Sequence, residues 1–357
     1  MFFYLGNDCT LLNKQRENLF TDLGWKQQDD VYYKGYCLDY SIDSNIGKIL
    51  SGDKPQGIYC VIQNNKIFHS EIRPFPLYRK GDELTNLKLE NFEEIEYNRY
   101  QLPNTSKSFD DVVKDVVNIL VENLSKIELN IWCTGGIDSM MLVAVAEYAK
   151  LPYTIHITKP NKSPNIRLFE GSVEEYNSPL VEFCRKNYWA YKFLSNFNNK
   201  TITTGFYGDE YFCRTVWQIN ILANSIGKLG PEVVKATDYA HSQVNRYKNT
   251  LMMADINDAK SATLDTVGSS HVWHIDNTIT FCPYLDKQII DCVWSLDEKD
   301  LLNYAVDATI QKEIIRSTTP DVMLLTDTQK NTLLGRRNFF ENLNKVKLAN
   351  CNDIVVH

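Results

Sequence analysis

The stretch CTGGIDS at residues 133–139 decides the fold, because two glycines join a short apolar run to a longer one. The run before it, LNIWC at 129–133, predicts a buried strand, and the apolar segment 139–148 predicts a helix. Gly135 and Gly136 permit the sharp turn that a strand-to-helix connection of this kind needs. The backbone amides at the start of the helix would then point at the turn and favour an anion.

The polar side chains of this turn indicate a phosphate site that includes a metal ion. Thr134 and Ser139 supply hydroxyl donors, whereas Asp138 would repel a phosphate unless a cation lay between them. The stretch therefore suits a pyrophosphate complexed with Mg²⁺, and an ordinary β-turn-α connection with paired glycines is the alternative. Neither the P-loop pattern GxxxxGK[ST] nor the dinucleotide pattern GxGxxG occurs in the chain.

The sequence on either side of the turn predicts alternating helices and strands. SFDD at 108–111 has the form of a capping box, and the apolar residues that follow at helical spacing predict a helix over Phe109–Leu124. Further strands are expected at 153–158 and 201–204, with a helix at 174–187 between them. Such alternation predicts the α/β class, with a doubly wound parallel sheet.

The chain before this region predicts a small β-rich unit. Gly57–Gln63 and residues 66–72 flank the turn-forming pair Asn64-Asn65, so we expect a hairpin. The prolines of RPFP at 73–76 would end its ladder, because proline has no amide hydrogen to donate.

The polar, acidic stretch 86–105 is interpreted as the connection between two domains. The first would span residues 1–105 and the second 106–357, since a chain of 357 residues exceeds the size at which one core stops growing. After about residue 218 the chain is expected to be mostly helical, with a break near 278–283.

Composition limits the class of protein. The chain carries 38 Lys and Arg against 45 Asp and Glu, and this net charge of −7 disfavours an electrostatic nucleic-acid binder without excluding a local basic patch. Its nine cysteines include no C-x-x-C pair, which predicts reduced thiols rather than a disulfide framework or a zinc knuckle. No apolar run has the length of a membrane span, and no secretory signal is recognised. We therefore expect a cytoplasmic protein that makes no membrane contact, with an oligomeric state that the sequence does not determine.

The turn at 133–139 resembles the pyrophosphatase loop, S/T-G-G-x-D-S, of the ATP-pyrophosphatase superfamily, whose members cleave ATP between the α and β phosphates. Later motifs resemble, in the same order, those of asparagine synthetases and their relatives, the β-lactam synthetases and lasso-peptide cyclases. These motifs are TGFYGDE at 204–210, CPYLD at 282–286, KEIIR at 312–316 and QK at 329–330. The helix predicted at Phe109–Leu124 resembles the helix that leads into the loop in that family. With it, the resemblance runs from about residue 107 to 335 and implies the synthetase domain of that family.

The resemblance implies that ATP and Mg²⁺ bind at the carboxyl ends of the strands. Asp138 and Asp209 would hold Mg²⁺, and Lys312 and Lys330 would neutralise the β and γ phosphates as pyrophosphate leaves. A helix cap is the alternative for Asp209, and solvated surface is the alternative for each lysine. Asp286 is expected to organise a loop or cap a helix, and Arg316 to form an ion pair with neighbouring acids. The nucleotide cradle would comprise Cys133, Thr134, Gly135, Gly136, Asp138, Ser139, Ile157 and Gly205.

One position departs from the family. After the S/T-G of the later motif, asparagine synthetases have a catalytic glutamate and β-lactam synthetases a tyrosine, but here the residue is Phe206, which cannot transfer a proton. Tyr207, one residue on, is the candidate substitute, and Glu210 of the same motif is the other candidate catalytic residue. Without such a substitute, the acceptor chemistry differs from both relatives or the activity is lost.

The N-terminal unit is also similar, more faintly, to the family's glutaminase domain, through Gly57–Gln63 and RPFPLY at 73–78. A working glutaminase needs a cysteine as its processed N-terminal residue, whereas here Phe2 follows Met1 and the earliest cysteine is Cys9. The unit is also much shorter than a full glutaminase domain. We therefore expect no glutamine hydrolysis, as in β-lactam synthetases, where the equivalent domain is structural.

The resemblance implies an ATP-dependent amide-bond synthetase that forms AMP and pyrophosphate. A small-molecule or peptide carboxylate would attack the α phosphate, and ammonia or another amine would displace AMP from the acyl-adenylate. Two alternatives stay open: an enzyme that adenylates a nucleic-acid base, and a catalytically silent ATP-binding homologue.

Overall fold

The computed structural model of the chain describes about half of residues 1–105 and about half of residues 106–357. Within these parts the strands form three sheets, one parallel and two antiparallel. The described residues are 4–5, 26–38, 42–64, 66–70, 77–85, 91–95, 106–157, 197, 201–205, 208–212, 279–297, 300–301, 304, 307–326 and 332–357.

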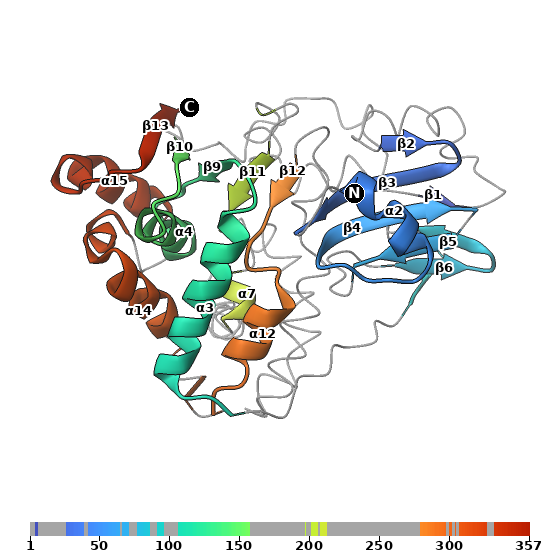
Figure 1. The fold of residues 1–357 in the computed structure, drawn as a ribbon, viewed down its shortest axis with the longest axis horizontal. Helices are drawn as coiled ribbons and strands as arrows, with labels where there is room; N and C mark the ends of the chain where they lie inside the picture. Colours follow the sequence, from blue (N-terminus) through green and yellow to red (C-terminus); the bar gives the residue numbers. More distant parts are fainter. Residues whose placement is uncertain are drawn as a thin grey trace, which may run out of the picture.

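The parallel sheet has five described strands in the spatial order β12-β11-β9-β10-β13, and every neighbouring pair is parallel (Figure 1). The expected α/β class with a parallel sheet is confirmed. The strands predicted around 129–133, 153–158 and 201–204 are present, whereas the sequence missed the two edge strands. The five strands are β9 (Leu129–Trp132), β10 (Tyr153–Ile157), β11 (Thr201–Thr204), β12 (Ile279–Phe281) and β13 (Cys351–Val356).

The strand order reverses between β9 and β11. From β9 the chain continues to β10 on one side, whereas β11 and β12 follow on the other side. Connections that leave neighbouring carboxyl ends in opposite directions open a crevice there, and open α/β sheets bind ligands at such a switch point. The turn at 133–139 follows β9 and the motif at 204–210 follows β11, so both motifs lie at this point.

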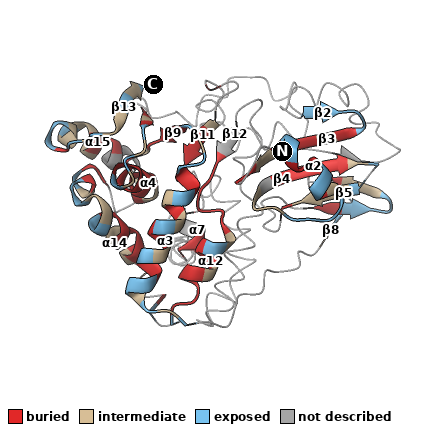
Figure 2. Cartoon of the chain, viewed as in Figure 1, coloured by how far each residue is buried: buried red, intermediate tan, exposed pale blue. Residues whose placement is uncertain are grey.

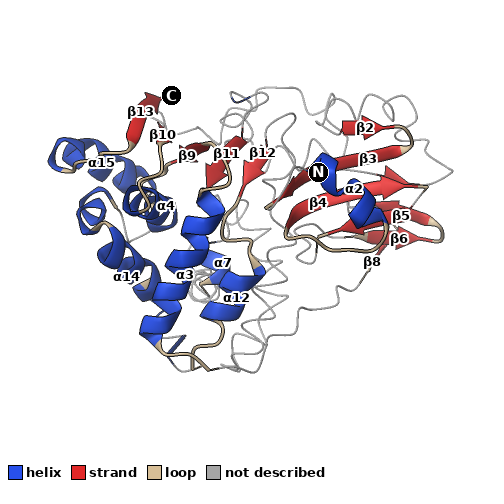
Figure 3. Cartoon of the chain, in the orientation of Figure 1, coloured by secondary structure: helices blue, strands red, loops and turns tan. Residues whose placement is uncertain are grey.

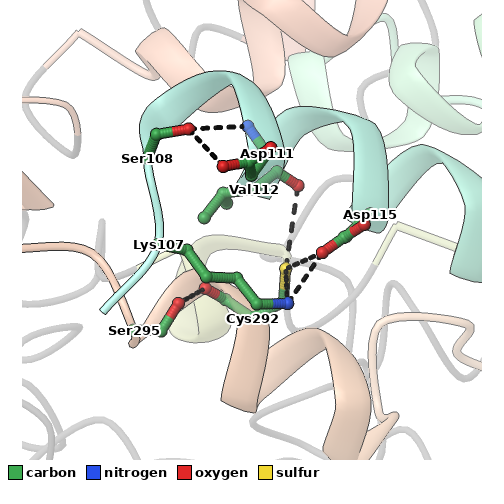
Figure 4. Close-up of polar contacts among 7 residues, drawn as sticks. All are labelled: Lys107, Ser108, Asp111, Val112, Asp115, Cys292 and Ser295. Atoms are coloured by element: carbon green, nitrogen blue, oxygen red, sulfur yellow. Dashed lines mark hydrogen bonds and ion pairs between the residues drawn. The ribbon is translucent and has the colours of Figure 1, made fainter. Parts of the chain in front are cut away.

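The helix α3 (Phe109–Leu124) leads into the sheet and begins as the capping box predicts. The Ser108 hydroxyl accepts from the Asp111 amide at 3.2 Å and donates to the Asp111 carboxylate at 2.6 Å (Figure 4). Every fourth residue of its inner face is buried, which ties the helix to the core. These residues are Val112, Val116, Leu120 and Leu124.

The start of α3 is fixed against α12 (Lys287–Val293). Figure 4 shows the Lys107 side chain beside Asp115, 2.7 Å away, and near the thiol of Cys292, 3.8 Å away. The hydrogen bond that Lys107 donates to the Asp115 carboxylate raises the pKa of Lys107. Burial raises the pKa of Cys292 to about 11, so this cysteine stays a neutral thiol that packs as a small apolar group.

The helix α4 (Ile137–Tyr148) lies at the centre of the core, and ten of its 12 residues are buried (Figure 2). It is covered by α14 (Thr309–Thr318) and by the 3-10 helix η5 (Pro320–Leu325). The Thr319 hydroxyl between these two donates to the Ala144 carbonyl at 2.8 Å. A helix enclosed in this way is apolar on all sides, which explains the uninterrupted apolar segment of the sequence.

Further helices complete the described part of this region. They are α7 (Gly208–Tyr211), α15 (Thr332–Asn342) and the 3-10 helix η6 (Leu343–Lys345). Figure 1 shows α3, α4, α7, α12 and α14 on the same side of the parallel sheet.

The N-terminal unit contains an antiparallel sheet in the order β2-β3-β4-β5, covered by the helix α2 (Ile42–Leu50) (Figure 3). The predicted hairpin is confirmed, because Gln63 pairs with Lys66 and Asn64 takes a positive φ of 49° in the turn. Apolar residues of α2 pack on β3 and β4 in a small core of their own. The strands are β2 (Lys26–Gln28), β3 (Val31–Cys37), β4 (Gly57–Gln63) and β5 (Lys66–His69).

A second antiparallel sheet, in the order β1-β7-β6-β8, corrects one expectation. Its last strand, β8, falls within 86–105, the stretch interpreted as a connection, and pairs with β6 through Tyr78 and Arg79. This stretch therefore contributes a strand to the N-terminal unit. The strands are β1 (Tyr4–Leu5), β6 (Tyr78–Lys80), β7 (Glu83–Thr85) and β8 (Glu93–Glu94).

Two further expectations concern helices. The helix predicted at 174–187, and the mostly helical region from 218 to 278, lie outside the described residues. After residue 278, helices are present, but so are the strands β12 and β13. In the part of the chain that the structure describes, no helix is long and apolar enough to cross a membrane.

Candidate functional site

The turn between β9 and α4 is held in shape by its own hydroxyl groups. The Thr134 amide donates to the Ser139 hydroxyl at 3.2 Å, and the Gly136 amide donates to the Thr134 hydroxyl at 3.3 Å. The Ser139 hydroxyl in turn donates to the Gly136 carbonyl at 3.0 Å. Gly135 has a φ of +73°, a conformation that favours glycine. The two hydroxyls expected to bind phosphate therefore also define the shape of the turn.

The amino end of α4 begins at a glycine. Gly136 is the N-cap residue, and it has no side chain that could bond to the first turn of the helix. The dipole of the helix favours a negatively charged ligand at this end. The sequence predicts an anion site at the same turn.

Gly205, at the end of β11, contacts the backbone of this first turn. A Cβ atom at Gly205 would lie 2.7 Å from the Ser139 amide nitrogen and 2.9 Å from the Asp138 carbonyl carbon. A Cβ atom at Gly208, where α7 begins, would lie 2.6 Å from a carboxylate oxygen of Asp138. Both glycines of the later motif are thus needed for close approach to the turn. The structure brings the two motifs together at the switch point between β9 and β11.

Asp138 is also contacted from two later elements. The Tyr284 hydroxyl donates to the Asp138 carbonyl at 2.6 Å, and the Gln311 side-chain amide lies 3.5 Å from the Asp138 carboxylate. Neither residue was among the sequence-predicted site residues. Both stand inside or beside motifs that were, since Tyr284 belongs to CPYLD and Gln311 precedes Lys312.

Lys312 follows Gln311, whose side chain reaches Asp138, in the first turns of α14. The residue is half-buried, and its amide donates to the Ala308 carbonyl at 2.9 Å. A lysine beside an anion site could supply positive charge to a bound phosphate.

Cys133 and Ile157 lie at the ends of their strands, but their groups are engaged with the protein. The Cys133 thiol is buried 3.2 Å from the sulfur of Met140, and burial raises its pKa to about 11. Its side chain therefore faces the core beneath α4. The Ile157 carbonyl accepts from the His357 amide at 2.8 Å, which ties β10 to the end of β13.

A histidine pair that the sequence did not indicate lies next to Ile157. A ring nitrogen of His156 is 3.2 Å from one of His357, and its other ring nitrogen is 3.3 Å from the Asn130 side-chain oxygen. The ring of Phe197 packs edge-on against His156, with centroids 4.7 Å apart. Burial lowers the pKa of His357, because a desolvated imidazole resists protonation.

Two structural roles expected from the sequence are confirmed. Asp286 caps α12, accepting from the Gln288 amide at 2.8 Å, and also accepts from the buried Asn123 at 2.7 Å. Burial raises the pKa of Asp286, and these hydrogen bonds oppose the shift. Arg316 forms an exposed ion pair with Glu313, at 3.5 Å.

The remaining predicted residues are not brought into contact by what the structure describes. The backbones of Asp209 and Glu210 belong to α7, directly after Gly208, but their side chains, together with Phe206, Tyr207 and Lys330, lie outside the described parts. Within the described ranges, no group of three or more His, Cys, Asp or Glu side chains could hold a metal ion. A metal at this site would therefore depend on Asp138, a further carboxylate and the oxygens of a ligand.

Comparison with known proteins adds no assignment. No protein-family model matches the chain, and no curated protein matches it.

Proposed function

We propose that the chain is an ATP-dependent amide-bond synthetase of the asparagine-synthetase-like type, which forms AMP and pyrophosphate. Its larger part would be an ATP-pyrophosphatase domain with a doubly wound sheet, and its N-terminal part a degenerate glutaminase-like unit. The observation that carries the proposal is the contact of Gly205 with the first turn of α4. Two motifs that are 65 residues or more apart in the sequence, CTGGIDS and TGFYGDE, meet there at a strand-order reversal.

The residues at this point fit a nucleotide phosphate with Mg²⁺. The amino end of α4, which begins at Gly136, suits an anion through the helix dipole, and Asp138 supplies a carboxylate beside it. Mg²⁺ usually takes one or two carboxylates and completes its shell with phosphate oxygens and water, so it needs no larger protein cage. Asp138 and Asp209 would hold the ion, which would neutralise charge on the phosphates.

The other residues have roles that follow from charge and position. Lys312 and Lys330 would stabilise pyrophosphate as the bond between the α and β phosphates breaks. The carboxylate substrate attacks the α phosphate, giving an acyl-adenylate and pyrophosphate, and an amine then displaces AMP with loss of a proton. Tyr207 and Glu210 are the candidates to receive that proton, since Phe206 cannot.

The test is release of pyrophosphate from ATP by the purified chain with Mg²⁺, an amine and a panel of small-molecule and peptide carboxylates. We expect Asp138→Asn to lose Mg²⁺-dependent turnover at least a hundredfold, because it removes the charge that binds the ion. Asp110→Asn, on the exposed first turn of α3, is the matched control and should retain wild-type turnover. Unchanged activity in Asp138→Asn would contradict the site.

A catalytically silent ATP-binding protein is the second candidate, and the specific observation in its favour is Phe206 at the position of the catalytic residue. Titration calorimetry with Mg-ATP separates the two. Binding without pyrophosphate release for any substrate favours the silent protein, and absence of binding contradicts both.

A further inference from the structure

The N-terminal unit meets the parallel sheet at the segment that follows β12. The Tyr36 hydroxyl, on β3, accepts from the Cys282 amide at 3.2 Å and lies 3.5 Å from the Cys282 carbonyl oxygen. The Tyr36 ring packs edge-on against Phe281, with centroids 5.2 Å apart. Gln56, on the same unit, donates to the Asp286 carboxylate at 3.2 Å. Figure 1 shows β3 and β12 facing each other across this contact.

Residues 282–285 form a tight turn, here called the bridging turn. The Leu285 amide donates to the Cys282 carbonyl at 3.0 Å, which closes the turn. Pro283 stands at its second position, where the fixed φ of proline favours a β-turn. The turn continues into Asp286, whose carboxylate is held by Asn123 and the start of α12. Because the turn is restrained at both ends, a displacement of one end should move the other end as well.

The bridging turn ends at the candidate site. Tyr284 is fully buried, and its hydroxyl donates to the Asp138 carbonyl at 2.6 Å. Its ring packs edge-on against Phe212, which follows α7. Contacts to the N-terminal unit and to the site therefore lie two residues apart, at Cys282 and Tyr284.

We propose that the N-terminal unit positions the first turn of α4 through the bridging turn, with Tyr36 and Tyr284 as positioning residues. The unit would act as a support that orients Asp138 and the backbone beside it. The identity of the ligand rests on the proposed function, but the mechanical connection does not.

The test compares Tyr284→Phe and Tyr36→Phe with Tyr148→Phe, a control at the exposed far end of the same helix. Amide hydrogen exchange of the ligand-free protein is measured over the peptides that cover 134–146. We expect exchange at the start of α4 to accelerate about five- to tenfold in Tyr284→Phe, less in Tyr36→Phe, and not at all in Tyr148→Phe, since one buried hydrogen bond is lost. The affinity for Mg-ATP should fall in the same order.

The double variant, Tyr36→Phe with Tyr284→Phe, tests whether the two act in series. Its effect on exchange should be smaller than the sum of the single effects, whereas additive effects would contradict the connection. Unchanged exchange at α4 in Tyr284→Phe, or an equal acceleration throughout the chain, would also overturn the proposal. If Tyr284→Phe does not fold, Tyr36→Phe alone decides, because its hydroxyl lies outside the site. If the wild-type chain does not bind ATP, that result contradicts the proposed function but does not affect the conclusion from hydrogen exchange.

Discussion

The absence of a side chain at Gly205 allows the end of β11 to approach the first turn of α4 closely. Because a Cβ atom there would overlap the first turn of α4, any larger residue must push β11 and α4 apart. The glycine therefore sets the distance between the two motifs. The steric contact explains why a glycine stands there.

We expect Gly205→Ala to lower the free energy of unfolding by about 1–3 kcal/mol, the usual cost of forcing atoms into a packed region. It should also abolish Mg-ATP binding, because the anion site changes shape. The matched control is Gly47→Ala on the exposed face of α2, where a Cβ atom meets nothing within 4 Å. That variant should gain about 0.5–1 kcal/mol, since alanine is the better helix former. Urea unfolding and calorimetry measure both, and equal stability of the two variants would refute the steric explanation.

Glu147 is a buried residue, and both of its carboxylate oxygens accept hydrogen bonds from neighbouring residues. Its carboxylate accepts from the Tyr153 hydroxyl at 2.7 Å, the Asn350 amide at 2.9 Å and the Ala349 amide at 3.1 Å. Burial, and then the bond to this carboxylate, raise the pKa of Tyr153, which keeps the phenol protonated as a donor. Glu147 thus joins the end of α4 to the turn that starts β13.

We expect Glu147→Gln to destabilise the fold by about 1–3 kcal/mol, because one acceptor oxygen becomes a donor facing other donors. The same substitution at Glu122, whose ion pair with Lys126 is exposed, should cost no more than about 0.5 kcal/mol. Chemical denaturation monitored by circular dichroism distinguishes them. A Glu147 variant as stable as the Glu122 variant would show that the carboxylate is not needed.

At the scale of elements, β13 is joined to the sheet by tertiary contacts that the residue pattern of a strand does not reveal. Its sequence, CNDIVV, begins with polar residues, and its place beside β10 is set by Glu147 and by the His156–His357 pair. Similarly, β12 has only three residues and follows a region without strand signals. Both are edge strands of a parallel sheet, where tertiary contacts rather than periodicity determine pairing.

The elements that were predicted have strong local determinants. The capping box predicted the start of α3 at Phe109, and the paired asparagines predicted the position of the hairpin turn. The two glycines predicted the boundary between β9 and α4. The contacts of the candidate site were predictable only in part. CTGGIDS and TGFYGDE indicated that two turns would meet, but Tyr284 and Gln311 reach Asp138 through packing that sequence spacing does not encode.

The edge formed by β13 should loosen in acid. The pKa of His357 lies below its ordinary value of about 6.5, so between the two values the unfolded chain binds a proton that the folded chain does not. Stability is therefore complete above pH about 6.5 and falls as the pH drops through this window. A charged His357 would also face His156, while Asn130 and Phe197 offer no compensating negative charge.

Thermal unfolding of the wild type and His357→Asn at pH values of about 7.5 and 5.5 tests this expectation. At pH about 7.5 the wild type should have a higher Tm than His357→Asn. At pH about 5.5 this difference in Tm should shrink or reverse, because only the wild type has the imidazole to protonate. A difference that is the same at both pH values would show that His357 does not titrate in this window.

At the scale of the whole molecule, the chain combines one parallel sheet with two antiparallel sheets. Under the proposed function, ammonium or another amine should support product formation, whereas glutamine should not raise the rate. The measurement is amide product and AMP with each nitrogen source at saturating ATP and carboxylate. Glutamate release from glutamine would contradict the interpretation of the N-terminal unit.

The self-bonded turn at residues 134–139 has a consequence for the thermodynamics of ligand capture. Because Thr134, Gly136 and Ser139 already fix one another, the loop has little conformational entropy left to lose when an anion arrives. Affinity is then governed by desolvation and by charge rather than by the cost of ordering a loop. The turn is preorganised, and its rigidity belongs to the free protein as much as to any complex.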